Sequence, residues 1–180
     1  MHEQIARTPY PRTAMCWAPL RGDRSLASMA KHDMIMSSPQ AFGLEWDRQP
    51  SVLATAFTPA SIEAARARAA GLRRRPNAVL IGDLSFYEVG ENQLPEDHPW
   101  WLRKEGKREQ FWPGTYRMDW YRQDYQESVI QRSLALYETG VVDGVFYDNL
   151  RDEPEPWVKI VRPIRRAVGD RFLMFVNVGY

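Results

Sequence analysis

Short runs of hydrophobic residues recur along the chain and alternate with segments that have helical spacing. Each run starts apolar and turns polar at its carboxyl end, which is typical of a parallel strand covered on both faces. The expected strands lie at residues 13–20, 32–39, 78–87, 141–149 and 172–178. Residues 51–56 would add a sixth strand.

Helical spacing fills most of the stretches between these runs. Thr58-Pro59 predicts a helix start, because the threonine hydroxyl can cap free N–H groups and proline fits the first helical position. Gly140 stands where a left-handed helix cap is needed, and Pro163 should bend the last helix. The expected helices lie at residues 25–30, from residue 58 over about 14 residues, at 125–137 and at 157–168. Residues 89–120 have no clear period, and a loop of this length usually binds or covers a site.

The order of elements predicts an α/β fold with a parallel sheet and right-handed crossovers. A parallel β/α barrel of TIM type needs about 250 residues, so we expect an incomplete barrel with about five or six of the eight strands. Residues 1–12 should be disordered or extended, and residues 13–180 should form the barrel domain, truncated at its C-terminus. An open doubly wound sheet also fits the length, but no glycine-rich phosphate turn follows any strand. The open edges of an incomplete barrel predict self-association.

Composition narrows the classes of partner. The net charge is +1 and the pI about 7.9, so no basic face for nucleic acid is expected. No apolar run is long enough to cross a membrane, and residues 1–12 lack the apolar core of a signal peptide. We therefore expect a soluble chain whose parent protein could still be secreted or periplasmic. Cys16 is the single cysteine and the three histidines are scattered, so neither a metal site nor a cofactor is predicted.

Carboxylates and amides follow several of the predicted strands. Asp83 and Glu88 lie at the end of one strand, Asp148 closes another, and Asn177 lies near the end of the last. Neighbouring strands are about 4.8 Å apart, so carboxylates on their ends can approach the roughly 5 Å used in retaining glycoside hydrolysis. Alternatively, a strand-end aspartate caps the following loop through bonds to backbone N–H groups. The flanking Tyr147 and Asn149 favour a ligand site at Asp148.

Aromatic residues are dense between positions 100 and 125. Their flat rings can stack on the C–H faces of sugars, while the polar tips of Trp and Tyr reach hydroxyl groups. The same rings could instead fill the interior of a long loop. The predicted substrate-binding residues are Trp17, Trp112, Tyr116, Trp120, Tyr147, Asn149 and Asn177.

Several segments of the chain resemble the glycoside hydrolase-like TIM-barrel families, which are distantly similar to endo-α-1,4-polygalactosaminidase and α-galactosidase barrels. The segments are His32-Asp33-Met34-Ile35-Met36, Asn77 to Asp83, Phe111-Trp112-Pro113, Met118-Asp119-Trp120 and, most specific, Val142-Asp143-Gly144-Val145-Phe146-Tyr147-Asp148-Asn149. The resemblance implies that Asp148, which closes the fourth strand, is the nucleophile. It also implies an acid/base carboxylate on a later strand than this chain contains; either Asp83 or Glu88 substitutes for it, or the parent protein supplies it.

Two functions follow as hypotheses. The first is a glycosidase that acts on a poly- or oligosaccharide through the strand-end carboxylates Asp148, Asp83 and Glu88. The second is a carbohydrate-binding domain on the same fold that uses the aromatic loop 100–125 and cleaves nothing.

Overall fold

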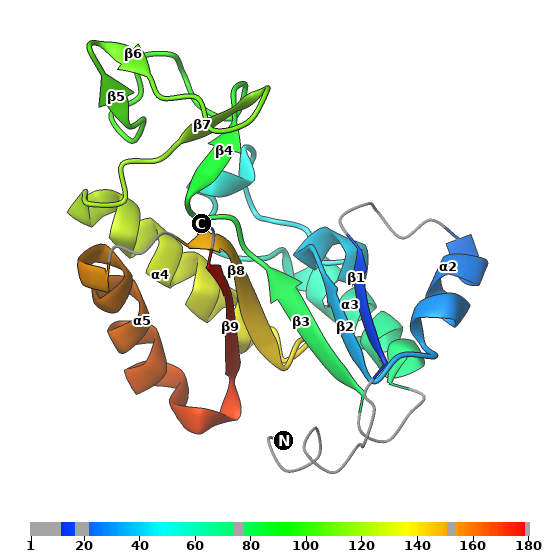
Figure 1. The fold of residues 1–180 in the computed structure, drawn as a ribbon. Helices are drawn as coiled ribbons and strands as arrows, with labels where there is room; N and C mark the ends of the chain where they lie inside the picture. Colours follow the sequence, from blue (N-terminus) through cyan, green and yellow to red (C-terminus); the bar gives the residue numbers. More distant parts are fainter. Residues whose placement is uncertain (1–11, 17–21, 74–77, 151–153, 179–180) are drawn as a thin grey trace.

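A parallel sheet of five strands forms the centre of the computed structural model, which describes residues 12–16, 22–73, 78–150 and 154–178 (Figure 1). The strands are β1 (Thr13–Cys16), β2 (Met34–Ser37), β3 (Val79–Asp83), β8 (Gly144–Leu150) and β9 (Leu173–Val178). Their order across the sheet, β1-β2-β3-β8-β9, repeats their order along the chain. A doubly wound sheet reverses its order at a switch point, so this alternative is wrong for the described strands. The predicted segment 1–12 lies almost wholly outside the described residues.

Helices follow the strands of this sheet (Figure 1). They are α2 (Gly22–Met29), α3 (Pro59–Leu72), α4 (Gln123–Glu138) and α5 (Pro154–Val168), with short 3₁₀ turns at Pro39–Phe42, Ser51–Leu53 and Gly169–Arg171. None of the helices within the described residues has the length and apolar character to span a membrane.

Two local predictions, of a strand at residues 51–56 and of a helix cap at Thr58, are wrong, and a third, at Gly140, is confirmed. The expected sixth strand at residues 51–56 is wrong, because Ser51–Leu53 is a 3₁₀ turn that buries only Val52. The Thr58 side chain makes no cap bond to α3; the Ser61 hydroxyl instead donates to the Thr58 carbonyl over 2.9 Å. Gly140 does adopt the left-handed conformation, with φ of 64°.

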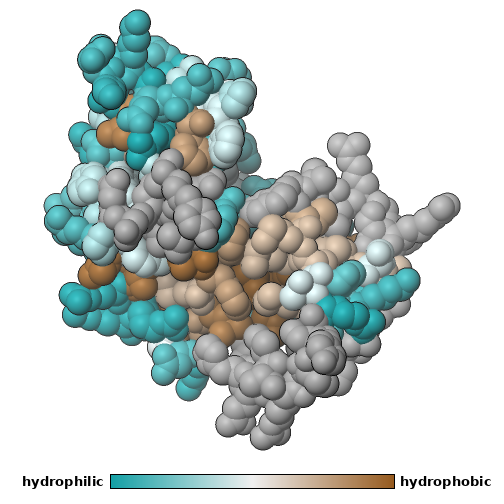
Figure 2. Space-filling view, viewed as in Figure 1, coloured by the Kyte–Doolittle hydropathy of each residue, from teal (hydrophilic) through white to brown (hydrophobic). Residues whose placement is uncertain are grey.

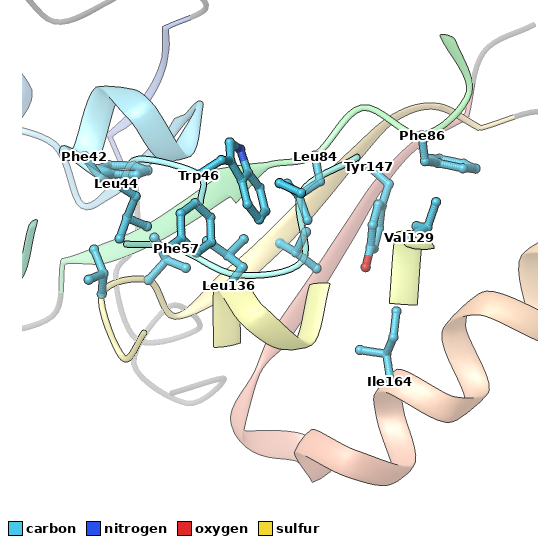
Figure 3. Packing of buried hydrophobic residues seen from close by; sticks show 14 of the residues in the cluster. Phe42, Leu44, Trp46, Phe57, Leu84, Phe86, Val129, Leu136, Tyr147 and Ile164 are labelled. Carbon is cyan, nitrogen blue, oxygen red and sulfur yellow. The ribbon is translucent and has the colours of Figure 1, made fainter. Parts of the chain in front are cut away.

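The two faces of the sheet have different apolar clusters. Ile35, Leu80, Val145 and Tyr147 belong to the large core shared with α3, α4 and α5, part of which Figure 3 shows. Side chains on the opposite face form a smaller cluster of Met36, Val79, Ile81, Phe146 and Leu173. Figure 2 shows hydrophobic residues gathered across the middle of the molecule, where Figure 1 shows the strands.

Glycine allows α4 to pack close to the sheet. A Cβ atom on Gly82, in β3, would lie 2.8 Å from a methyl carbon of Leu136 on α4. The absence of a side chain at Gly82 therefore sets the distance between this helix and the sheet.

Residues 84–122, between β3 and α4, fold into an excursion beyond the carboxyl ends of the strands (Figure 1). Two small antiparallel pairs shape it: β4 (Glu88–Gly90) with β7 (Thr115–Arg117), and β5 (Arg103–Lys104) with β6 (Lys107–Arg108). The Arg108 guanidinium lies 4.1 Å from the ring centre of Tyr116 and 5.0 Å from that of Trp101. Part of the aromatic density in the sequence therefore stabilises the excursion itself.

Candidate active site at the carboxyl edge of the sheet

Two aspartates lie on the same face of neighbouring strands at the carboxyl edge. Asp83 ends β3 and is in register with Phe146 on β8, so Asp148 lies two residues further along β8. Side chains two residues apart on a strand point to the same face, and the spacing puts the two aspartate Cα atoms roughly 8 Å apart. The register thus brings together the pair that the sequence predicted.

The environment of Asp83 favours its protonated form. Burial and, second, the negative charge of Asp148 raise the pKa of Asp83 to about 7. The Oδ1 atom of Asp83 is buried and has no hydrogen-bond partner among the described residues. A carboxylate without such partners is poorly stabilised in its ionised form, so Asp83 can carry a proton near neutral pH.

Asp148 has a different environment. The Asn177 side-chain amide on β9 donates a hydrogen bond of 2.7 Å to Oδ1 of Asp148. This bond orients the Asp148 carboxylate at the edge of the sheet. The sheet therefore brings Asp83, Asp148 and Asn177 together across three adjacent strands, β3, β8 and β9. The side chain of Asn149 lies outside what the structure describes.

A pocket of about 330 Å³ opens beside Asp83, between the loop after β2 and the start of the excursion. Glu88 lines it and accepts a hydrogen bond of 2.6 Å from the Thr115 hydroxyl. Asp148 is not among the lining residues, so only two of the three predicted carboxylates share this pocket. Its lining residues are Ser38, Pro39, Gln40, Trp46, Ser51, Val52, Asp83, Leu84, Ser85, Glu88, Val89, Gly90, Gln93, Thr115 and Arg132.

The predicted aromatic binding residues are not gathered at this pocket. Trp112 is 58% exposed, in the excursion, and its ring packs edge-on against Phe111. Trp120 and Tyr147 are buried in the core, at 1% and 0% exposure, so neither presents its ring to solvent. Tyr116 lies half-buried under Arg108.

Trp17 lies outside the described residues. The structure therefore offers no position for its ring.

Trp46 and Arg132 are among the pocket residues that were missed from the sequence. Trp46 lines the pocket and stacks on Phe57 with ring centres 3.8 Å apart (Figure 3). Arg132, on α4, is 5% exposed and lines the same pocket. Its signal in the sequence is a charged residue three positions after Val129, inside the apolar stripe of a helix.

Comparison with known proteins relates this fold to glycoside hydrolases. No protein-family model matches the sequence, and no curated protein matches it either. The glycoside hydrolase domain of PelA from Pseudomonas aeruginosa is 16% identical with a TM-score of 0.57, over 93% of this chain and 60% of that one. The GH36 alpha-galactosidase AgaB from Geobacillus stearothermophilus is 12% identical with a TM-score of 0.63, over 96% of this chain and 28% of that one.

A third similar structure is the maltogenic alpha-amylase AmyB from Thermotoga neapolitana. It is 15% identical with a TM-score of 0.59, over 91% of this chain and 44% of that one. The chain thus spans at most 60% of these three solved chains. It has a distant glycoside hydrolase-like fold, as the sequence resemblance implied.

Proposed function

We propose that this chain is a glycoside hydrolase domain that cleaves a poly- or oligosaccharide at the carboxyl edge of its sheet. The observation that carries the proposal is Asp83, a partly buried carboxylate whose Oδ1 is buried and whose pKa is raised to about 7 beside a second carboxylate, Asp148. Enzymes that cleave glycosides use one carboxyl group that is protonated and one that is ionised. Perturbed groups of this kind cluster at functional sites.

The two aspartates take different roles. Asp83 gives its proton to the glycosidic oxygen as the bond from that oxygen to the anomeric carbon breaks. Asp148, held by Asn177, is the nucleophile: its carboxylate oxygen bonds to the anomeric carbon, and water later breaks that bond. Asp83 then acts as the base that takes a proton from the water, and the site returns to its starting state. Glu88 lies across the pocket and contacts the substrate.

We infer that the five strands are part of a (β/α)₈ barrel. Three observations support this: the strands are all parallel, their order across the sheet follows the chain, and the face opposite the helical core carries its own apolar cluster. Inward-pointing apolar side chains fill the interior of such barrels, and their active sites lie at the carboxyl ends of the strands.

Release of reducing sugar from a panel of polysaccharides tests the proposal. Wild-type protein should release sugar from at least one member of the panel, and Asp148→Asn should lower that rate by at least about a thousandfold. Asp170→Asn, at an exposed position in a 3₁₀ turn, is the matched control and should keep the wild-type rate. Full activity in Asp148→Asn would remove this residue from the mechanism.

One observation favours a second function, carbohydrate binding without cleavage. Trp112 exposes more than half of its surface on the excursion, and an exposed indole suits a sugar ring. Under this function, Trp112→Ala would abolish binding on a glycan array, whereas Asp148→Asn would preserve it and no sugar would be released. Tyr121→Ala, at 53% exposure, is the control for general loss of an exposed ring.

A further inference from the structure

Arg132 is a buried cation that the proposed mechanism does not use. It lies in the middle of α4, is 5% exposed, and contributes to the wall of the pocket that also contains Asp83. Its Nε and Nη2 atoms are buried and have no hydrogen-bond partner among the described residues. An arginine stays charged in proteins, so it cannot relieve this burial by losing its proton.

The chemistry of the unpartnered atoms is specific. Nε–H and Nη2–H point in parallel from one edge of the guanidinium, and that edge matches the two oxygens of a carboxylate. The start of the same helix provides an example: Nε and Nη2 of its N-cap residue, Arg122, each bond one oxygen of Asp124, both over 3.0 Å. The matching edge of Arg132 has no such carboxylate within the described fold.

The neighbours of Arg132 do not neutralise it. Its guanidinium is in hydrogen-bonding contact with the Tyr125 hydroxyl, and its charge also acts on the Tyr147 hydroxyl. Both are neutral phenols, because burial raises the pKa of each. The Tyr125 hydroxyl donates to the Phe86 carbonyl, and the Tyr147 hydroxyl bonds to Ser133. No ion pair within the described residues joins Arg132 to either pocket carboxylate, Asp83 or Glu88. A buried, unpaired charge is costly to the fold, and a ligand of opposite charge would offset that cost.

We propose that the pocket binds a carboxylate-bearing sugar, a uronic acid residue, whose carboxylate bonds to Nε and Nη2 of Arg132. The proposal rests on the proposed function, because it names the class of sugar that this site takes. The edge of Arg132 has almost no accessible surface, so the carboxylate reaches it through a local shift of the pocket wall, which the opposite charges favour. A planar carboxylate fits the two parallel donors better than the tetrahedral oxygens of a sulfate or phosphate.

Titration of the protein with oligouronates, followed by NMR, tests this assignment. The probes are the trimers of galacturonate, glucuronate, mannuronate and guluronate, each beside its fully methyl-esterified form, which has the same ring but no charge. Titrations use Asp148→Asn, so that binding is measured in the absence of turnover. At least one trimer should bind at millimolar concentration, at least about tenfold more tightly than its ester, and should shift the Arg132 Nε–H signal.

Substitutions then assign the binding to Arg132. Arg132→Met, in the same background, should weaken uronate binding at least about tenfold and leave ester binding unchanged. Arg132→Lys keeps the charge but loses the parallel donors, so its affinity should lie between the two. Arg122→Met, at the N-cap of the same helix, is the matched control and should bind as tightly as the parent.

Thermal unfolding separates a binding role for Arg132 from a structural one. Removal of an unpaired buried charge should keep or raise the Tm of Arg132→Met, whereas loss of a structural contact would lower it. The proposal is overturned if no uronate binds, if esters bind as tightly, or if Arg132→Met binds uronate unchanged. Failure of the proposed function has a separate signature: uronate binds through Arg132, but wild-type protein releases no sugar from any uronate polymer.

Discussion

The two ends of the parallel sheet use aspartate in opposite ways. At the amino end, Asp143 accepts a bond of 2.9 Å from the Leu80 amide and pairs with Arg73 over 2.9 Å. Asp33, at the same end, accepts a bond of 2.9 Å from the Arg12 amide. At the carboxyl end, Asp83 is partly buried beside another carboxylate, and its buried oxygen, Oδ1, has no partner within the described residues.

The difference separates carboxylates that stabilise the fold from a carboxylate that is available for chemistry. A carboxylate that pairs with a cation and accepts from backbone N–H groups stabilises the fold, and its removal costs stability. A buried carboxylate without them destabilises the ionised state and can exchange a proton near neutral pH. Parallel α/β folds put their active sites at the carboxyl end, which agrees with this division. Substitutions at the two ends should therefore have opposite effects.

The largest expected effect is on catalysis. Asp83→Asn removes the proton donor and should lower kcat by about a hundredfold to ten-thousandfold. In wild-type protein, kcat/KM should fall as the pH rises through about 7, the pKa of Asp83, because the proton donor is then lost. Asp143→Asn, at the amino end, should keep its kcat per folded molecule. Initial rates between pH 5 and 9 measure the activity of both variants. An equal loss of activity in the two would contradict the contrast between the two ends of the sheet.

The next effect is on stability at the carboxyl end. Asp83 has a pKa of about 7 in the folded chain against 3.8 for the free group. The folded state therefore binds this proton more tightly than the unfolded state does, and the free energy of unfolding falls as the pH rises from about 4 through 7. The side chain of Asp83→Asn stays neutral, so at pH 8 the free energy of unfolding of this variant should exceed that of wild type by up to about 4 kcal/mol. At pH 4 the two should be nearly equal. Urea unfolding across this range measures the difference, and a constant gap between the two proteins would contradict the account.

The smallest effects are at the amino end and have the opposite sign. Asp143→Ala removes the acceptor of the Leu80 amide and leaves Arg73 without its carboxylate, which should cost about 2 kcal/mol at pH 7. Asp33→Ala should cost less than about 1 kcal/mol, because its pair with Arg12 is more exposed. Denaturant unfolding at fixed pH checks both values. A gain in stability in either variant would remove the contrast between the two ends.

Much of the fold could be predicted from the sequence because the strands are apolar almost throughout. The β3 run was expected at residues 78–87 and ends at Asp83, and α3 has the expected 14 residues. The 3₁₀ turn at Ser51–Leu53 was mistaken for a strand, since a short apolar run does not by itself decide between the two. The pairs β4–β7 and β5–β6 were also missed: their strands have two or three residues, which is too short for an alternating pattern.

The site was less predictable because burial depends on contacts between distant segments. Asp83 and Asp148 could be proposed from their strand ends alone, and their common face then follows from the register of β3 and β8. Trp120 was expected to face a sugar, yet its ring packs against Phe86 and Tyr87 in the core. Arg132 was missed because a charged residue is not expected at a buried position on the apolar face of α4.

The arginines of α3 and of its C-cap, Arg73, also make contacts with distant segments that the sequence does not predict. As a charge run on a helix they are typical of a solvated surface, but three of them reach back to backbone carbonyls. Arg66 donates to Thr139, Arg68 to Ala41 and Arg73 to Val141, over 3.0 to 3.1 Å. Sequence spacing gives the face of a helix but not which distant carbonyl its long side chains reach.

Direct titration of the Asp83 carboxyl carbon by ¹³C NMR tests the central claim, that the carboxyl edge holds an aspartate that keeps its proton near neutral pH beside a second carboxylate. The account predicts a pKa of about 7 for Asp83 in the folded protein, and a lower pKa once Asp148→Asn removes the neighbouring charge. A titration of Asp83 near 4 that is unchanged by Asp148→Asn would contradict it.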